Sequence, residues 1–162
     1  MVVILILIGL LVALFAGSFL SKRRFGMLGM GLAAGAIISP IWGDTAGYVI
    51  SASGLVQEGP LVNAIAVSVL ILVPAVLFMF HGYTYKHIFG RIIGSLSFML
   101  LAAAFLVEPV GAAFVLSGPA ADAYSWFVMY HELIISAGVS FAVADLLLAR
   151  PVHKEEKGRH KH

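Results

Sequence analysis

The chain has 162 residues and no cysteine, and 61% of its residues are hydrophobic whereas 11% are charged. A typical soluble domain is about 45–50% apolar and about 25% charged, and so short a chain has too little interior to hide this much apolar surface from water. The composition therefore excludes an ordinary soluble domain and predicts an all-α integral membrane protein. Without cysteine the chain has no disulfide framework and no thiol nucleophile, and a net charge of +2 is too small to indicate nucleic-acid binding.

The first predicted span covers residues 2–20, which carry no charge and match the length of about 20 residues that a membrane helix needs. Lys22, Arg23 and Arg24 follow this apolar run, whereas a secretory signal begins with its positive charges. This order favours a retained helix with its N-terminus outside over a cleaved signal.

Four further spans are predicted from the remaining apolar runs, at 25–42, 61–83, 88–107 and 126–149. Segment 44–58 mixes apolar and polar residues, and it is interpreted as a short helix on the outer membrane surface or as a loop. Segment 110–117 either extends the fourth helix past Pro109 or lies at the outer interface. We favour the interface, because Glu108 would otherwise lie in lipid.

The charges between the spans predict an orientation. All lysine and arginine residues lie in segments 21–24, 84–91 and 150–162. The charged residues of segments 43–60 and 108–125 are aspartate and glutamate only. Connections rich in lysine and arginine lie on the cytoplasmic side of a membrane. We therefore predict one transmembrane domain over 1–149, a bundle of about five helices with the N-terminus outside and the C-terminus inside. A basic, histidine-containing cytoplasmic tail follows over 150–162.

Small residues recur at four-residue spacing in several spans. Such residues let helix backbones approach closely in lipid, where the hydrophobic effect between helices is weak. They predict ordinary packing within the bundle, or a contact between copies of the chain through the first or second helix. The predicted packing residues are Gly9, Ala13, Gly17, Gly31, Gly35, Gly90, Gly94 and Gly138.

Polar residues within membrane spans are costly and often functional. At 100° per residue, His131, Gly138 and Asp145 fall on one stripe of the fifth helix. This stripe could face the bundle, with Asp145 at an inner mouth, or Asp145 could pair with Arg150 or with a basic residue of an inner connection. Alternatively, these polar side chains are solvated by water at the membrane interface and have no functional role. The candidate functional residues are His131, Glu132, Asp145 and Glu108.

Three motifs would indicate a cofactor or a metal ion, but the surrounding sequence argues against each of them. Residues 29–34 match G-x-G-x-x-A, but they lie inside a predicted membrane helix with no strand before them. His131 and Glu132 begin like a zinc motif, but Ile135 takes the place of the second histidine. His81 and His131 lie at opposite ends of their helices, roughly 20 Å apart along the bundle axis, too far to share a haem. We therefore expect no cofactor, no metal and no enzymatic activity.

Two motifs carry a family resemblance. Residues 21–29 (Ser-Lys-Arg-Arg-Phe-Gly-Met-Leu-Gly) form a basic turn after the first helix, and residues 90–98 (Gly-Arg-Ile-Ile-Gly-Ser-Leu-Ser-Phe) start the fourth. With the long apolar helix between them, this layout over about residues 1–111 resembles the colicin V production protein family of bacterial inner-membrane proteins. The family has an Arg-Gly turn followed by glutamate, whereas here Phe25 separates the two residues and no glutamate follows. Phe98 replaces a second glycine, and the fifth helix and tail lie outside the family's usual four-helix pattern.

The resemblance implies a non-enzymatic accessory or structural protein of the inner membrane that supports colicin V export or envelope homeostasis. Its expected partners are the lipid bilayer, other membrane proteins or a second copy of the chain. The alternative is a proton- or ion-coupled transporter or channel component that uses the polar stripe of the fifth helix. An intramembrane enzyme is a third class, and it would have to use Glu108, His131 and Glu132.

Overall fold

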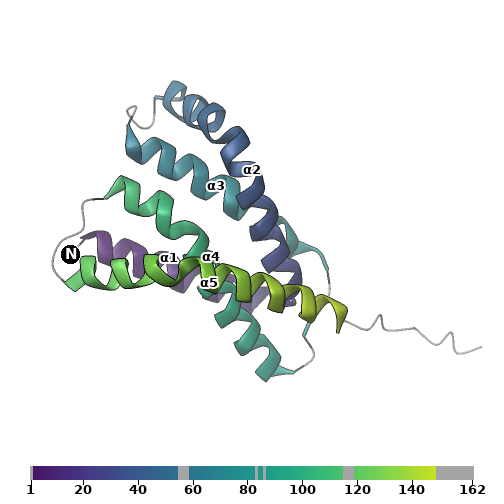
Figure 1. Cartoon of the computed structure of the whole chain (residues 1–162). Helices are drawn as coiled ribbons and strands as arrows, with labels where there is room; N and C mark the ends of the chain where they lie inside the picture. The colour runs from purple at the N-terminus through teal and green to yellow at the C-terminus, as the bar shows by residue number, and fades with distance from the viewer. Residues whose placement is uncertain (1, 55–58, 83, 86, 115–118, 149–162) are drawn as a thin grey trace, which may run out of the picture.

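The computed structural model describes residues 2–54, 59–82, 84–85, 87–114 and 119–148. Within these residues the chain forms five helices and no strand, which confirms the predicted all-α bundle (Figure 1). An isolated bridge between Arg23 and Thr84 is the only β-type pairing of the described part. The helices are α1 (Val2–Ser21), α2 (Phe25–Ala52), α3 (Pro60–Phe80), α4 (Ile88–Ala113) and α5 (Pro119–Leu147).

Four helices are long and apolar enough to cross a membrane, judged by length and composition: α2, α3, α4 and residues 124–147 of α5. A span of about 20 residues crosses the hydrocarbon core at a rise of about 1.5 Å per residue. The first helix is as apolar as these and has 20 residues. The fold is that of a multi-pass membrane protein.

The most extensive contact in the bundle joins α2 and α3, which run side by side as an antiparallel hairpin (Figure 1). Glycines allow this close approach. At Gly31 a Cβ atom would lie 2.7 Å from the Cα atom of Ala75, and at Gly35 it would overlap the backbone of Ile71. These two predicted packing residues therefore serve contacts within the chain.

The central helix of the bundle is α4, which packs against each of the other four helices. Its buried Phe98 and Leu101 meet Phe25 and Leu28 of α2 in a core to which every helix contributes. Apolar side chains occupy this core across the middle of the bundle. Its remaining buried members are Leu14, Leu32, Ile71, Ala75, Ala102, Leu106 and Ala142.

The predicted end of the second span at residue 42 was wrong, because α2 continues through Pro40 to Ala52. Proline removes a backbone donor and usually kinks or ends a helix. Here the carbonyl of Ala36, which Pro40 cannot bond, accepts a hydrogen bond of 3.1 Å from the Ser39 hydroxyl. Residues 44–52 of the expected surface helix or loop are thus the last part of α2, and residues 55–58 lie outside the described residues.

The fourth helix also passes its proline and continues to Ala113. The alternative, an extension past Pro109, describes residues 110–113, and residues 115–117 lie outside the described residues. Glu108 lies 20 residues beyond Ile88, about 30 Å along α4, and its side chain is 72% exposed.

The remaining predicted packing residues have different surroundings. Gly90 and Gly94 contact the ring of Tyr85, and Gly138 faces the side chain of Leu101. Gly17 lies at ordinary contact distance from Met79, at 3.7 Å from a hypothetical Cβ atom. On α1, Gly9 has no atom within 4 Å of such a Cβ and Ala13 is exposed.

Candidate functional site

Two connections meet at one end of the bundle and bring four helix ends together. The backbone N–H of Tyr85 donates to the carbonyl of Lys22 at 2.9 Å, beside the bridge between Arg23 and Thr84. Lys22 has φ 58°, a left-handed conformation that non-glycine residues seldom adopt. This turn directs the chain from α1 into α2 and places Arg23 and Arg24 at this same end of the bundle.

Asp145, in the last turn of α5, is the centre of this end. Its carboxylate accepts a hydrogen bond from Arg24 Nη2 at 2.8 Å, from the backbone N–H of Gly26 at 2.9 Å and from the Tyr85 hydroxyl at 3.3 Å. The residue is 8% exposed. The first N–H groups of a helix lack intrahelical partners and carry partial positive charge. Asp145 of α5 therefore caps the N-terminus of α2.

Tyr85 completes the arrangement from the connection between α3 and α4. Its hydroxyl accepts a hydrogen bond of 3.2 Å from the N–H of Phe25 while donating to Asp145, and the Arg24 guanidinium lies 5.5 Å from its ring centroid. Burial raises the pKa of Tyr85; the hydrogen bond from the Phe25 N–H lowers it by less, and the negative charge of Asp145 raises it again by a smaller amount. The hydroxyl is therefore protonated at neutral pH and available as the donor.

Close backbone contact between α2 and α5 makes this capping possible. A Cβ atom at Gly26 would lie 2.6 Å from the carbonyl oxygen of Ala142, and one at Gly29 would lie 2.8 Å from the Ala142 Cβ atom. Glycine at both positions allows α5 to cross α2 closely enough for Asp145 to reach the first turn of α2. We call Arg24, Gly26, Tyr85 and Asp145 the inner cluster.

Two further arginines at the same end bind helix carbonyls. Arg23 donates from Nε to Met79 at 3.0 Å and from Nη2 to Phe80 at 2.8 Å, and it also contacts the carbonyl of Gly82. Arg91 donates to the carbonyl of Phe19 at 2.8 Å and stacks over its ring at 4.3 Å. The last carbonyls of α3 and α1, which lack intrahelical donors, thus gain cationic partners.

The opposite end carries a second polar contact, between α4 and α5. Glu108 Oε1 lies 3.3 Å from His131 Nε2, and the other ring nitrogen, Nδ1, lies 2.6 Å from the carbonyl oxygen of Val128. The His131 side chain is 14% exposed and that of Glu108 is 72% exposed. We call Glu108 and His131 the outer pair. Glu132 is exposed and lies outside this contact.

The predicted stripe of α5 faces the bundle, and both of its polar ends have partners on other elements. Asp145 pairs with Arg24 of the connection between α1 and α2, one of the pairings that the sequence left open; Arg150 lies outside the described residues. Between the ends, Leu101 packs against Gly138, with a methyl carbon 2.9 Å from a hypothetical Cβ, and Ala142 is fully buried. The stripe is polar at its ends and closed by apolar atoms in the middle.

Sequence reasoning missed Tyr85 and Gly26 as parts of the inner cluster, and it named Arg24 only as one of several basic residues that Asp145 could pair with. The signals that could have found them are an isolated tyrosine in a short polar connection and a glycine two residues after an arginine at a helix start. Neither signal names Asp145 as the partner, because that residue follows 119 residues after Gly26 in the chain.

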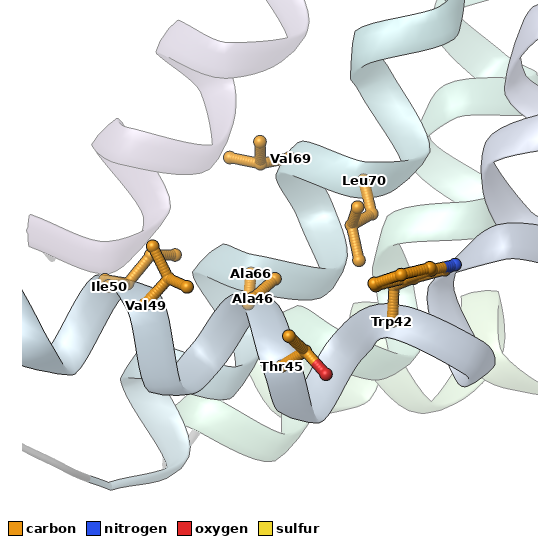
Figure 2. A pocket seen from close by; sticks show the side chains of 8 residues that line it. All are labelled: Trp42, Thr45, Ala46, Val49, Ile50, Ala66, Val69 and Leu70. Atoms are coloured by element: carbon orange, nitrogen blue, oxygen red, sulfur yellow. The ribbon is translucent and has the colours of Figure 1, made fainter.

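A shallow hollow of about 320 Å³ lies between α2 and α3, away from both polar ends (Figure 2). Ligand pockets need a few placed polar groups to orient their ligand, and the Thr45 hydroxyl is the only side-chain polar group here besides the Trp42 indole. Among the described residues, no three histidine, aspartate or glutamate side chains are placed to hold a metal ion. The hollow is lined by Trp42, Thr45, Ala46, Val49, Ile50, Ala66, Val69 and Leu70.

No protein-family model, curated protein or solved structure matches the chain. The case for a function therefore rests on the inner cluster, the outer pair and the apolar packing between them. The resemblance to the colicin V production protein family stays an expectation from sequence.

Proposed function

We propose that the chain is a non-enzymatic inner-membrane protein of accessory or structural type that supports export or envelope homeostasis. It acts by associating with other membrane proteins or with a second copy of itself. The observation that carries this proposal is the closed apolar middle of the α5 stripe, where Leu101 fills the space beside Gly138 and Ala142 is fully buried. Conduction through the bundle would need polar groups or water at this depth.

The ends of the bundle support the same proposal. Arg23 and Arg91 bind helix carbonyls, and Arg24 and Asp145 bind each other. These charges thus stabilise the helix arrangement, which leaves the apolar outer surface for association with other membrane components. A structural role of this kind requires a stable bundle rather than a reactive group.

The orientation of the proposal is N-terminus outside and C-terminus inside. Lys22, Arg23, Arg24 and Arg91 gather at one end of the bundle, whereas Glu108 lies at the other end of α4. Cytoplasmic connections carry an excess of lysine and arginine, so the inner cluster is assigned to the cytoplasmic side. Reporter fusions at the connection after α1 and at the connection after α2 should report inside and outside, respectively; the reverse result would contradict the assignment.

The test of the accessory role is extraction of the full chain from its native membrane in lipid nanodiscs without detergent. We expect a defined complex, either with another membrane protein or with a second copy of the chain. The Asp145→Asn variant, which perturbs the inner cluster, should lose that complex, whereas the exposed variant Glu132→Gln should keep it. A chain that is strictly monomeric and without partners in the native membrane would contradict the proposal.

A transport component is the second candidate, and the inward-facing positions of His131 and Asp145 on one helix favour it. Its test is proton and cation flux into proteoliposomes that contain the purified chain. Transport would replace the accessory role if the parent protein supports flux, Asp145→Asn abolishes it and Glu132→Gln does not. Flux equal to that of protein-free liposomes would end the transport alternative.

A further inference from the structure

The hydrogen bond from the His131 ring to Val128 fixes where one ring proton lies. Nδ1 is 2.6 Å from the carbonyl oxygen of Val128, and a carbonyl oxygen can only accept. Nδ1 must therefore carry a hydrogen and donate it. In neutral imidazole one nitrogen donates and the other accepts, so the Nε2 atom of a neutral His131 would present a lone pair.

That lone pair would face another acceptor. Nε2 lies 3.3 Å from Glu108 Oε1, and an ionised carboxylate oxygen also only accepts. Two acceptors at this distance repel unless a proton lies between them. We propose that the outer pair is a proton-operated latch: one proton from the outer aqueous phase, held between Glu108 and His131, closes the contact between α4 and α5.

The position of the pair gives the proton access. The Glu108 side chain is 72% exposed and lies about 30 Å along α4 from Ile88, a length that crosses the hydrocarbon core. In the orientation proposed above, the carboxylate therefore faces the outer aqueous phase. His131 is largely enclosed, so that its Nε2 exchanges protons through the carboxylate side. The chemistry is a reversible protonation with no other reactant: the proton taken up comes from water outside and returns to it.

No other ionisable group competes for His131 among the described side chains. Helices α1 and α3 contain no ionisable residue. Arg24, just before α2, is bound to Asp145 of α5. The other ionisable side chains of α2, α4 and α5 are exposed or bound elsewhere, and they are Asp44, Tyr48, Arg91, Asp122, Tyr124, Tyr130 and Glu132.

The latch lies where α4 lacks one of its backbone hydrogen bonds. Pro109 directly follows Glu108 and cannot donate a backbone hydrogen bond to the preceding turn. Two contacts with α5 hold α4 directly before this proline: the outer pair at Glu108, and the Tyr124 hydroxyl, which donates to the Val107 carbonyl at 3.3 Å. Tyr124 also packs against Gly111 in the last turn of α4. The latch is therefore closed while the proton is held between the two side chains, and it opens when that proton returns to water.

The experiment follows the mobility of one nitroxide label on the last turn of α4. Because the chain has no cysteine, Ala112→Cys adds a unique attachment site at an exposed position of α4. Electron paramagnetic resonance spectra of the full chain in nanodiscs are compared at about pH 5 and about pH 8. We expect an immobilised label at the lower pH and a mobile label at the higher pH, and a label at Ser136→Cys on α5 should show no change.

Variants of the pair separate protonation from general effects of pH. Glu108→Gln replaces the carboxylate by an amide that can donate to neutral Nε2, so the label should stay immobilised at both pH values. His131→Gln should likewise remove the pH dependence, and Glu132→Gln, the matched exposed control, should behave as the parent. The proposal is overturned if the parent label has the same mobility at both pH values. It is equally overturned if the pH-dependent change persists in Glu108→Gln or in His131→Gln.

Discussion

Replacing Gly35 by alanine tests the closest helix contact in the bundle. A Cβ atom at this position would lie 2.6 Å from the carbonyl oxygen of Leu70 and 2.7 Å from the Cα atom of Ile71, which are both backbone atoms of α3. Ordinary contacts begin at 3.4 Å and the Ile71 carbonyl oxygen is nearer still than that of Leu70, so α2 and α3 would have to separate by at least about 0.8 Å in a tightly packed interior. Backbone atoms cannot turn away as a flexible side chain can.

The expected cost follows from two opposing effects. Overpacking a well-packed interior costs about 1–3 kcal/mol, and the higher helix propensity of alanine offsets up to about 1 kcal/mol of this. Because the obstructing atoms belong to the backbone, the cost should lie in the upper part of its range, about 2–3 kcal/mol, and the net loss in the free energy of unfolding is then about 1–2 kcal/mol. For a chain of this length each kcal/mol lowers the Tm by about 2–4 °C, so Gly35→Ala should melt about 2–8 °C below the parent.

The assay is thermal unfolding of the full chain in detergent micelles, followed by the fluorescence of Trp42 and Trp126. Gly9→Ala is the matched control, because a Cβ atom at Gly9 meets nothing within 4 Å. Its Tm should equal or slightly exceed that of the parent. If Gly35→Ala and Gly9→Ala melt at the same temperature, the close contact between α2 and α3 does not determine stability and the reasoning fails.

Three further predictions concern the inner end. Asp145→Ala should lower the free energy of unfolding by about 3 kcal/mol in a denaturant titration, because it leaves the Arg24 guanidinium partly buried without its partner; a loss no larger than that of an exposed substitution would contradict the pairing. Since burial raises the pKa of Tyr85, the parent should lose stability as the pH rises above about 10, where the unfolded tyrosine ionises, and Tyr85→Phe should lose less. Arg91→Leu should destabilise the protein by about 1–2 kcal/mol through the unbonded Phe19 carbonyl, whereas retained stability would show that water replaces the guanidinium.

The helices themselves could be predicted because hydropathy is a local property of the chain. Apolar runs of membrane length gave the five helices, whereas the end of α2 was wrong by ten residues. A proline lowers the stability of a helix, but whether it ends the helix depends on local rescue. Ser39 supplies that rescue at Pro40 by bonding the Ala36 carbonyl, and nothing in the spacing of the two residues distinguishes rescue from termination.

The partners of the polar groups could not be predicted, because they are separated along the chain. Sequence singled out Asp145 as an unusual charge in a span, and the structure places it against Arg24, 121 residues earlier. Glycine spacing was equally incomplete as a signal. Gly9 and Gly35 belong to similar stripes, yet one is open and the other is closed against α3, since the outcome depends on which helix crosses at that level.

The two ends of the bundle are stabilised to different degrees, and this difference predicts which end opens first. Helices in lipid gain little from the hydrophobic effect, so polar contacts and close packing fix their arrangement. At the inner end, Asp145 is bonded to three groups, and Arg23 and Arg91 bind further carbonyls.

At the other end, two side-chain contacts at 3.3 Å hold α4 directly before Pro109, one of them the outer pair. Because opening is easiest where contacts are few, amide hydrogen exchange in nanodiscs should be faster for residues 110–113 of α4 than for the first residues of α2 that gain hydrogen bonds at the inner cluster. Equal protection of the two regions would mean that the inner cluster adds no local stability, and that the polar contacts at the two ends are equivalent.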